Sequence, residues 1–266
     1  MKSSLFLIVI CITVCFPLPV SQAQAKILHL NATELMHNNG WDDGVAIVTA
    51  NGLYGTGWWV GRNVMITAGH VVEYHEGRVV TVIHGNFETT GTVIKVDRRR
   101  DIAIIRTESM PPNAHIFPLA RELRKTETIY VIGYPFELVQ LEHDIHRLTT
   151  NPRVAEGTIA WIDTDDGIAE ITAHTDAGNS GGPVVNQNGE VVGLVSFALI
   201  GRASTLYFIT ISPEITHVLN SVNIQPETSH VNLSQHFNGV KYALLGLGGG
   251  IVGSLIVVNT LRGRRR

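Results

Sequence analysis

The chain has almost no cysteine: of its 266 residues only Cys11 and Cys15 are cysteines, and both lie among the first 25. A small secreted scaffold held together by disulfides is therefore excluded. The remaining body of about 200 residues is long enough to bury a stable apolar core without crosslinks.

Basic residues are too few for a nucleic-acid-binding protein. The formal net charge is −3, and it becomes about −8 when Lys2 and the four arginines of residues 262–266 are set aside. Phosphate backbones bind proteins of the opposite charge, so we expect no nucleic-acid partner. The sequence also lacks metal-ligand and nucleotide-binding motifs, so we expect no cofactor and no metal.

Residues 45–212 contain no long run of amphipathic helical pattern, which disfavours a βαβ architecture. They carry about a dozen short runs rich in valine, isoleucine, threonine and aromatic residues, among them VAIVTA, RVVTVIH, GTVIKVD, IAIIR, IYVIGYP, EVVGLVSFAL and LYFITIS. Runs of this length, separated by glycine, asparagine and aspartate, predict an all-β fold with one or two closed barrels.

One helix and three tryptophans complete the expected body. Near its end, SPEITHVLNSV predicts a helix with Ser212 as its cap and Pro213 in its first turn. Trp58, Trp59 and Trp161 lie on predicted strands, and we expect them to fill barrel interiors.

The two ends of the chain predict export and a membrane anchor. Residues 1–25 have one lysine, an apolar run and a small-residue end, which is the order of a signal peptide. Residues 241–261 include about 19 consecutive uncharged residues, enough to cross a bilayer as a helix, and the basic residues 262–266 are expected to stay in the cytoplasm. Glycines in this helix offer a surface for self-association. An uncleaved N-terminal anchor, and a C-terminal tail that is removed to leave a secreted or surface-attached protein, both remain open.

Ser180 lies in a stretch from which large side chains are missing, TDAGNSGGP at residues 175–183. A nucleophilic serine needs an accessible oxygen, a base, and hydrogen-bond donors for the oxyanion that forms. With no side chain at Gly178, a substrate backbone can approach, and the N–H groups of Gly178 and Ser180 can point into one hollow. A glycine-rich turn with an incidental serine is the alternative.

Two upstream motifs supply the partners of such a serine. MITAGHVV presents His70 at the end of a predicted strand, and RRRDIAIIR places Asp101 at the start of another. The order histidine, aspartate, serine, separated by about 30 and 80 residues, is one of the orders in which catalytic triads recur.

TAGH, DIAII and GNSGGP resemble the three catalytic signatures of the chymotrypsin-like (trypsin-like) serine proteases, and most of all those of their HtrA/Deg branch. The resemblance covers residues 43–220 and implies two six-stranded antiparallel barrels with an active site between them. It also implies a serine endopeptidase, here membrane-anchored and extracytoplasmic, that acts on protein or peptide substrates. Ser180 would attack the peptide carbonyl, His70 would accept the serine proton, and Asp101 would hold the imidazole. The N–H groups of Gly178 and Ser180 would form the oxyanion hole.

This chain departs from the family pattern in three places. Asn179 stands where relatives activated by a newly freed N-terminus carry aspartate, so we expect activity without processing beyond the leader. Relatives in the HtrA/Deg branch usually carry a PDZ domain after the protease, and the polar stalk expected here, residues 221–240, is too short to hold one. On its other side the protease domain is preceded by an N-terminal segment, residues 26–42. Finally, the loop near Gly201 does not align with the family pattern, and the register places His174, Ser196, Phe197 and Ala198 in the lining of the substrate pocket. His174 could favour an acidic substrate side chain or simply narrow the pocket.

Two other functions fit parts of the sequence. GNSGG also matches the Gly-x-Ser-x-Gly elbow of α/β-hydrolases, which would make the protein an esterase. That elbow needs a helix after the serine, and Pro183 begins another strand-like run instead. The second alternative is a catalytically inactive protease fold that serves as a binding module.

Overall fold

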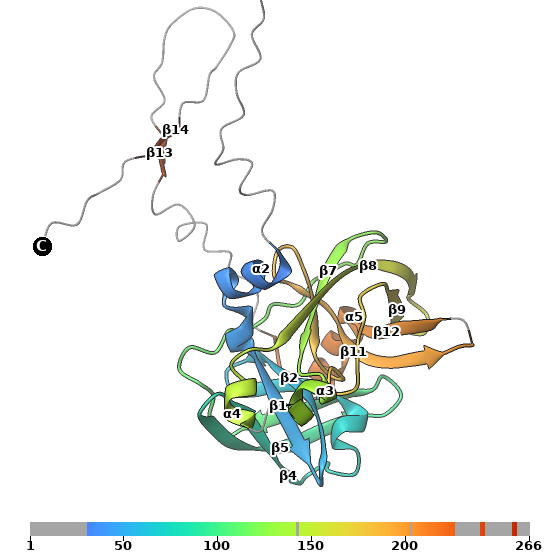
Figure 1. Cartoon of the computed structure of the whole chain (residues 1–266). Coiled ribbons are helices and arrows are strands. Elements are labelled where there is room, and N and C mark those ends of the chain that lie inside the picture. The colour runs from blue at the N-terminus through green and yellow to red at the C-terminus, as the bar shows by residue number, and fades with distance from the viewer. Residues whose placement is uncertain (1–30, 142–143, 203, 227–239, 243–256, 260–266) are drawn as a thin grey trace, which may run out of the picture.

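The computed structural model describes residues 31–141, 144–202, 204–226, 240–242 and 257–259 (Figure 1). The predicted signal peptide lies outside the described residues, as do most of the predicted stalk and the basic tail.

Two closed barrels of six antiparallel strands make up the body, as the sequence resemblance implies. The first barrel runs in the order β1-β2-β3-β6-β5-β4 and the second in the order β10-β11-β12-β9-β8-β7. In Figure 1 the first barrel, in blue and green, lies below the second, in yellow-green and orange. The strands of the first barrel are β1 (Val45–Ala50), β2 (Leu53–Gly61), β3 (Val64–Ala68), β4 (Val79–His84), β5 (Phe87–Asp97) and β6 (Ile102–Thr107). Those of the second are β7 (Thr128–Gly133), β8 (Arg153–Asp163), β9 (Ile168–Ile171), β10 (Pro183–Asn186), β11 (Val191–Ile200) and β12 (Thr205–Ile211).

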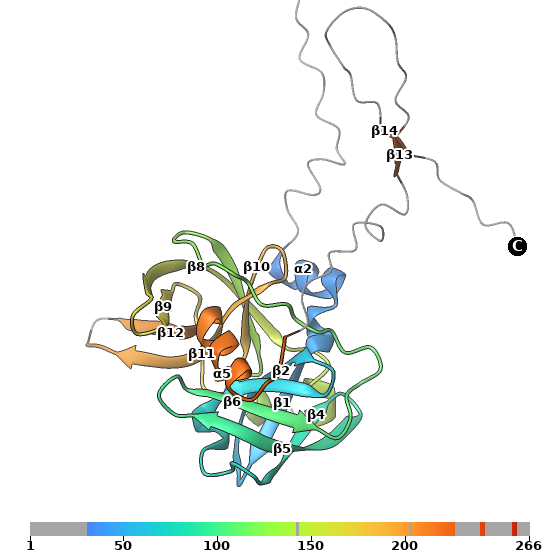
Figure 2. The same ribbon diagram turned by 180° about the vertical axis from the view of Figure 1, so that it is seen from behind.

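Short helices connect and cover the barrels. They are α2 (Ala32–Asn39), η1 (Trp41–Gly44), η2 (Gly69–Val72), α3 (Phe136–Leu141), α4 (Ile145–Leu148) and α5 (Ser212–Ser221). The N-terminal helix α2 contacts β8 of the second barrel, after which the chain enters the first barrel. Helix α5 contacts β11 and β12 and also β6 of the first barrel, so the last helix bridges the two (Figure 2).

The predicted helix is present, but the prediction that Ser212 caps it is wrong. The N-cap residue is Ile211, which makes no side-chain capping bond, and Ser212 is already inside the helix. The Ser212 hydroxyl instead donates to the carbonyl oxygen of Ala120 at 2.8 Å. Glu214 in the first turn forms an ion pair with Arg100, which holds the helix against the loop that precedes β6.

The tryptophans divide between core and surface. Trp58 and Trp59 on β2 are fully buried, as expected, whereas Trp161 on β8 is 40% exposed. The prediction for Trp161 is therefore wrong. The register of β8 and β9 shifts between Ile159 and Trp161, and such an irregularity changes which face of the strand each side chain occupies.

The C-terminal segment is described only in part. Within residues 241–261, expected as a transmembrane helix, the structure has the end of one three-residue strand, β13 (Val240–Tyr242), paired with another, β14 (Val257–Asn259). Residues 243–256 lie outside the described residues. None of the helices in the described part of the chain is long and apolar enough to cross a membrane.

Candidate active site

The segment that carries Ser180 is a tight turn that requires glycine at two positions. Gly178 and Gly181 have φ angles of +92° and +84°, in the region that other residues avoid. A Cβ on Gly178 would lie 2.3 Å from the carbonyl oxygen of Tyr134, and one on Gly181 would lie 2.4 Å from that of Thr56. These glycines are therefore required by the protein's own backbone, in addition to any room they leave for a substrate.

Thr56 on β2 fastens this turn to the first barrel. Its N–H donates to the carbonyl oxygen of Ser180 at 2.9 Å, and its hydroxyl donates to that of Gly178 at 2.8 Å. The same hydroxyl oxygen accepts the N–H of Tyr134 at 3.1 Å. Sequence reasoning missed Thr56, and its place between two glycines in GTGWW is the one signal that the sequence offers.

Two backbone N–H groups at the turn are free to donate. The carbonyl oxygen of Ala177 accepts the N–H of Phe136 at 2.7 Å, and because the peptide bond is trans, the N–H of Gly178 points the opposite way. Within the described residues, neither this N–H nor that of Ser180 has an acceptor in the protein. Both groups can therefore donate to an oxygen of a bound molecule.

Strand pairing brings His70 and Asp101 together. Ala68, the last residue of β3, pairs with Ile102, the first of β6, so the residues just beyond these strand ends are neighbours. Nδ1 of His70 lies 3.0 Å from both carboxylate oxygens of Asp101, and the backbone N–H of His70 donates to Oδ1 at 2.9 Å. Asp101 has a φ of +54°, a left-handed conformation that aspartate tolerates better than most residues.

A β-bulge in the second barrel supplies a third donor to Asp101. The register between β11 and β12 shifts between Val195 and Phe197, which leaves Ser196 outside the regular ladder. The Ser196 hydroxyl donates to Oδ2 of Asp101 at 2.6 Å, across 95 residues of sequence. Ser196 was expected to contact substrate, and the structure gives it this bond between the two barrels as well.

The hydrogen bond to Asp101 raises the pKa of His70 above its ordinary value of 6.5. Burial acts in the opposite direction, and the negative charges of Asp101 and Glu73 add to the rise. A general base must be neutral to accept a proton. A reaction that uses His70 as its base would therefore lose rate as the pH falls through a value above 6.5.

Ser180 and His70 line two adjoining hollows. The serine hollow, of about 390 Å³, contains Ser180, and the histidine hollow, of about 340 Å³, contains His70 and Asp101. Ser196 and Phe197 line both. Within the described residues the Ser180 hydroxyl makes no hydrogen bond to His70, and catalytic hydrogen bonds often tighten only when a substrate binds.

Three of the four residues expected to contact a substrate side chain line the serine hollow. These are Ser196, Phe197 and Ala198. His174 does not line the hollow: its side chain is 56% exposed, and both of its ring nitrogens are hydrogen-bonded to residues that do line it. These two bonds hold His174 against Asp176 and Tyr207.

Asn179 is buried beneath the turn, with 4% of its surface exposed. Its Oδ1 has no hydrogen-bond partner among the described residues. A neutral amide at this depth requires no counter-charge, unlike an aspartate. This agrees with the expectation that no newly freed N-terminus is needed, which stays a prediction.

The segment after Ser180 is a strand. Pro183–Asn186 form β10, which pairs with β7 and β11 in the second barrel. The strand-to-helix turn that an α/β-hydrolase elbow requires is therefore not present around Ser180.

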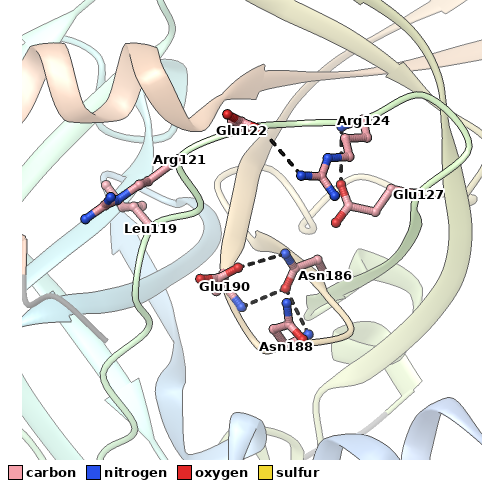
Figure 3. Close-up of a pocket in the computed structure, with 8 residues that line it drawn as sticks. All are labelled: Leu119, Arg121, Glu122, Arg124, Glu127, Asn186, Asn188 and Glu190. Atoms are coloured by element: carbon pink, nitrogen blue, oxygen red, sulfur yellow. Dashed lines mark hydrogen bonds and ion pairs between the residues drawn. The ribbon is translucent and has the colours of Figure 1, made fainter. Parts of the chain in front are cut away.

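A third hollow, of about 360 Å³, is lined by Asn186 at the end of β10 that is farther in sequence from Ser180. Figure 3 shows the residues that line this hollow. Two of its charged side chains form an ion pair, with Arg124 3.5 Å from Glu122, and Glu190 accepts the side-chain amide of Asn186 at 3.1 Å. It contains none of the motif residues, so it is not the candidate active site.

Two closed six-stranded barrels with a histidine, an aspartate and a serine at their junction define the chymotrypsin-like class of folds. Residues 55–194 match the model of the trypsin-like peptidase domain, and the chain belongs to this family. The resemblance drawn from TAGH, DIAII and GNSGGP is confirmed at the level of the family.

Curated relatives and solved structures agree with this assignment. The chain is 31% identical over 168 residues to the serine proteases MT3772 and Rv3671c from two strains of Mycobacterium tuberculosis. These matches cover 59% of this chain but only 39% of the relatives, so the chain spans well under half of their length.

Solved structures share the fold of this chain. The match to the crystal structure of the Rv3671c protease, inactive form, has a TM-score of 0.57 at 24% identity, covering 80% of this chain and 100% of that one. The serine endoprotease from Yersinia pestis has a TM-score of 0.57 at 19% identity, covering 70% and 66%. Likeness at these identities shows the shared fold.

Thr56→Val tests whether the hydroxyl of Thr56 holds the serine turn. Valine keeps the side-chain shape but loses the bond to Gly178 and leaves the N–H of Tyr134 unsatisfied, so we expect a loss of roughly 1–3 kcal/mol in the free energy of unfolding. We also expect a lower kcat for any reaction in which Ser180 takes part, because the turn is less firmly held. Urea unfolding and steady-state kinetics measure both, with Thr56→Ser as the control that keeps the hydroxyl. If Thr56→Val matches wild type in both measurements, the turn does not depend on this contact.

Proposed function

We propose that the protein is a serine endopeptidase that hydrolyses peptide bonds through an acyl-enzyme. In this proposal Ser180 Oγ attacks the carbonyl carbon of the scissile bond while His70 Nε2 takes the hydroxyl proton. The carbonyl oxygen becomes an oxyanion and accepts hydrogen bonds from the N–H groups of Gly178 and Ser180. Asp101 keeps Nδ1 of His70 protonated and stabilises the imidazolium that forms.

The remaining steps return the enzyme to its starting state. His70 gives its proton to the departing amine nitrogen, the carbon–nitrogen bond breaks, and Ser180 is left as an ester. A water molecule then gives a proton to His70 and attacks the ester carbon. Collapse of the second oxyanion breaks the bond to Ser180 Oγ, which recovers a proton from His70, and the new carboxylic acid leaves.

One arrangement carries the proposal: an imidazole oriented by a carboxylate lines a hollow that adjoins the hollow of a serine, and this serine lies beside two backbone N–H groups without an acceptor in the described protein. Membership of the trypsin-like peptidase family supports it. So do the curated relatives named as serine proteases, although the chain covers only part of their length.

Ser180→Ala is the direct test. A fluorophosphonate probe should label the wild-type chain covalently and should not label the variant, because alanine has no nucleophilic oxygen. Loss of the nucleophile is expected to lower kcat for peptide cleavage by on the order of 10⁶. Ser221→Ala, at the end of α5, is the control and should label like wild type.

The same experiment separates the two alternatives. An inactive binding module would not react with the probe under any condition. An esterase would react with the probe but would hydrolyse ester substrates and leave peptides of any sequence intact.

We also propose that the protease domain faces the outside of the cell and is anchored by the C-terminal segment, on the strength of the signal-like leader and the uncharged run before the terminal arginines. Because the body has no cysteine, Glu76→Cys gives a chain with one thiol once the leader is removed. A membrane-impermeant maleimide should label this thiol in intact cells, and the chain should remain with the membrane after alkaline carbonate washing. Labelling only after permeabilisation would contradict the outward orientation, and release by carbonate would contradict the anchor.

A further inference from the structure

The serine hollow is where a substrate side chain must lie during the proposed reaction. The residue whose carbonyl is attacked, called P1, has its side chain next to Ser180, and this hollow contains Ser180. Most of its wall is uncharged, with Val195 and Ala198 on β11 and Thr205 on β12. Among the described residues, Asp176 is the one acidic side chain that lines it.

A free carboxylate in that position would attract a basic P1 side chain, but both oxygens of Asp176 are already engaged. Nη1 of Arg153, the first residue of β8, lies 2.8 Å from Oδ2. Nε2 of His174 lies 2.8 Å from Oδ1. Arg153 itself does not line the hollow, and its guanidinium offsets the charge of Asp176 through this ion pair.

His174 is held in place on its other side. Its Nδ1 lies 2.6 Å from the hydroxyl oxygen of Tyr207, and the two rings pack edge to face with centroids 5.1 Å apart. With both ring nitrogens occupied, His174 is not available to receive an acidic P1 side chain. Hydrogen bonds thus join four side chains in a row: Arg153, Asp176, His174 and Tyr207. This row gives the hollow no net negative charge and no cation that is free to bind an acidic side chain.

We propose that Arg153 is a specificity-determining residue: by neutralising Asp176 it makes the pocket select an uncharged P1 side chain and reject lysine and arginine. This inference rests on the proposed function, because it takes the serine hollow as the P1 pocket. The inference also implies that the carboxylate of Asp176 would favour a basic P1 side chain if it were not paired. Removing the positive charge of Arg153 should therefore give the pocket a preference for lysine or arginine at P1.

The first experiment compares cleavage of matched peptide substrates with alanine, leucine, lysine or glutamate at P1. The full-length wild-type chain should prefer the uncharged residues. Arg153→Gln should raise the ratio of kcat/KM for lysine over alanine roughly tenfold, the order expected from one uncompensated charge near a protein surface. In Arg153→Lys this ratio should stay close to that of wild type, because lysine keeps the positive charge. Adding Asp176→Asn to Arg153→Gln should abolish the increase in the ratio. Arg121→Gln, an exposed change of the same charge at the third hollow, should leave the ratio unchanged.

A second experiment does not need catalysis. Benzamidine is a cationic mimic of a basic P1 side chain, and its binding to full-length Ser180→Ala can be followed by calorimetry. Adding Arg153→Gln should tighten its dissociation constant roughly tenfold, whereas adding Arg121→Gln should not.

The outcomes separate this inference from the proposed function. If wild type prefers lysine or arginine at P1, or if Arg153→Gln changes neither the cleavage ratio nor benzamidine binding, the role of Arg153 is wrong even though the protein is a protease. If the chain cleaves no peptide and fails to react with the fluorophosphonate, the proposed function fails. In that case, tighter benzamidine binding by Arg153→Gln still supports the masking of Asp176, and unchanged binding overturns it.

Discussion

The carboxylate of Asp101 is the contact on which the geometry of the site depends. It accepts the backbone N–H and the ring nitrogen of His70 from the first barrel and the hydroxyl of Ser196 from the second. Hydrogen bonds to an ionised acceptor are stronger than those between neutral groups, and here the bond from Ser196 crosses the junction of the two barrels. The orientation of the imidazole is therefore coupled to the relative position of the barrels.

The serine turn meets the same junction from the other side. Thr56 of the first barrel bonds to the carbonyl oxygens on both sides of Asn179, and no side chain larger than hydrogen fits at Gly178 or Gly181. The missing side chains of the GNSGG stretch thus reflect close packing between backbones as well as access for a ligand. Since the turn contacts β2 and Asp101 contacts β11, each barrel holds part of the other's site.

The short apolar runs predict the all-β fold, and the family resemblance of the three motifs implies its two barrels. The pairing of Ala68 with Ile102 explains why TAGH and DIAII meet. The positions of β-bulges and the contacts between residues far apart in the chain could not be predicted from the sequence. A register irregularity exposes Trp161 and another directs Ser196 to Asp101. The row from Arg153 to Tyr207 joins three separate strands or loops, and no local pattern marks it. Ser212 looked like a cap because local chemistry favours serine there, but a tertiary bond to Ala120 takes its hydroxyl.

The most direct test of this account is the pKa of His70, measured by NMR titration of the full-length Ser180→Ala chain with and without Asp101→Asn. The account predicts a pKa above 6.5 when Asp101 is present, because its hydrogen bond and charge favour the imidazolium, and a lower pKa in the Asp101→Asn chain. Equal values in the two chains would mean that Asp101 does not hold His70, and would contradict the account at its centre.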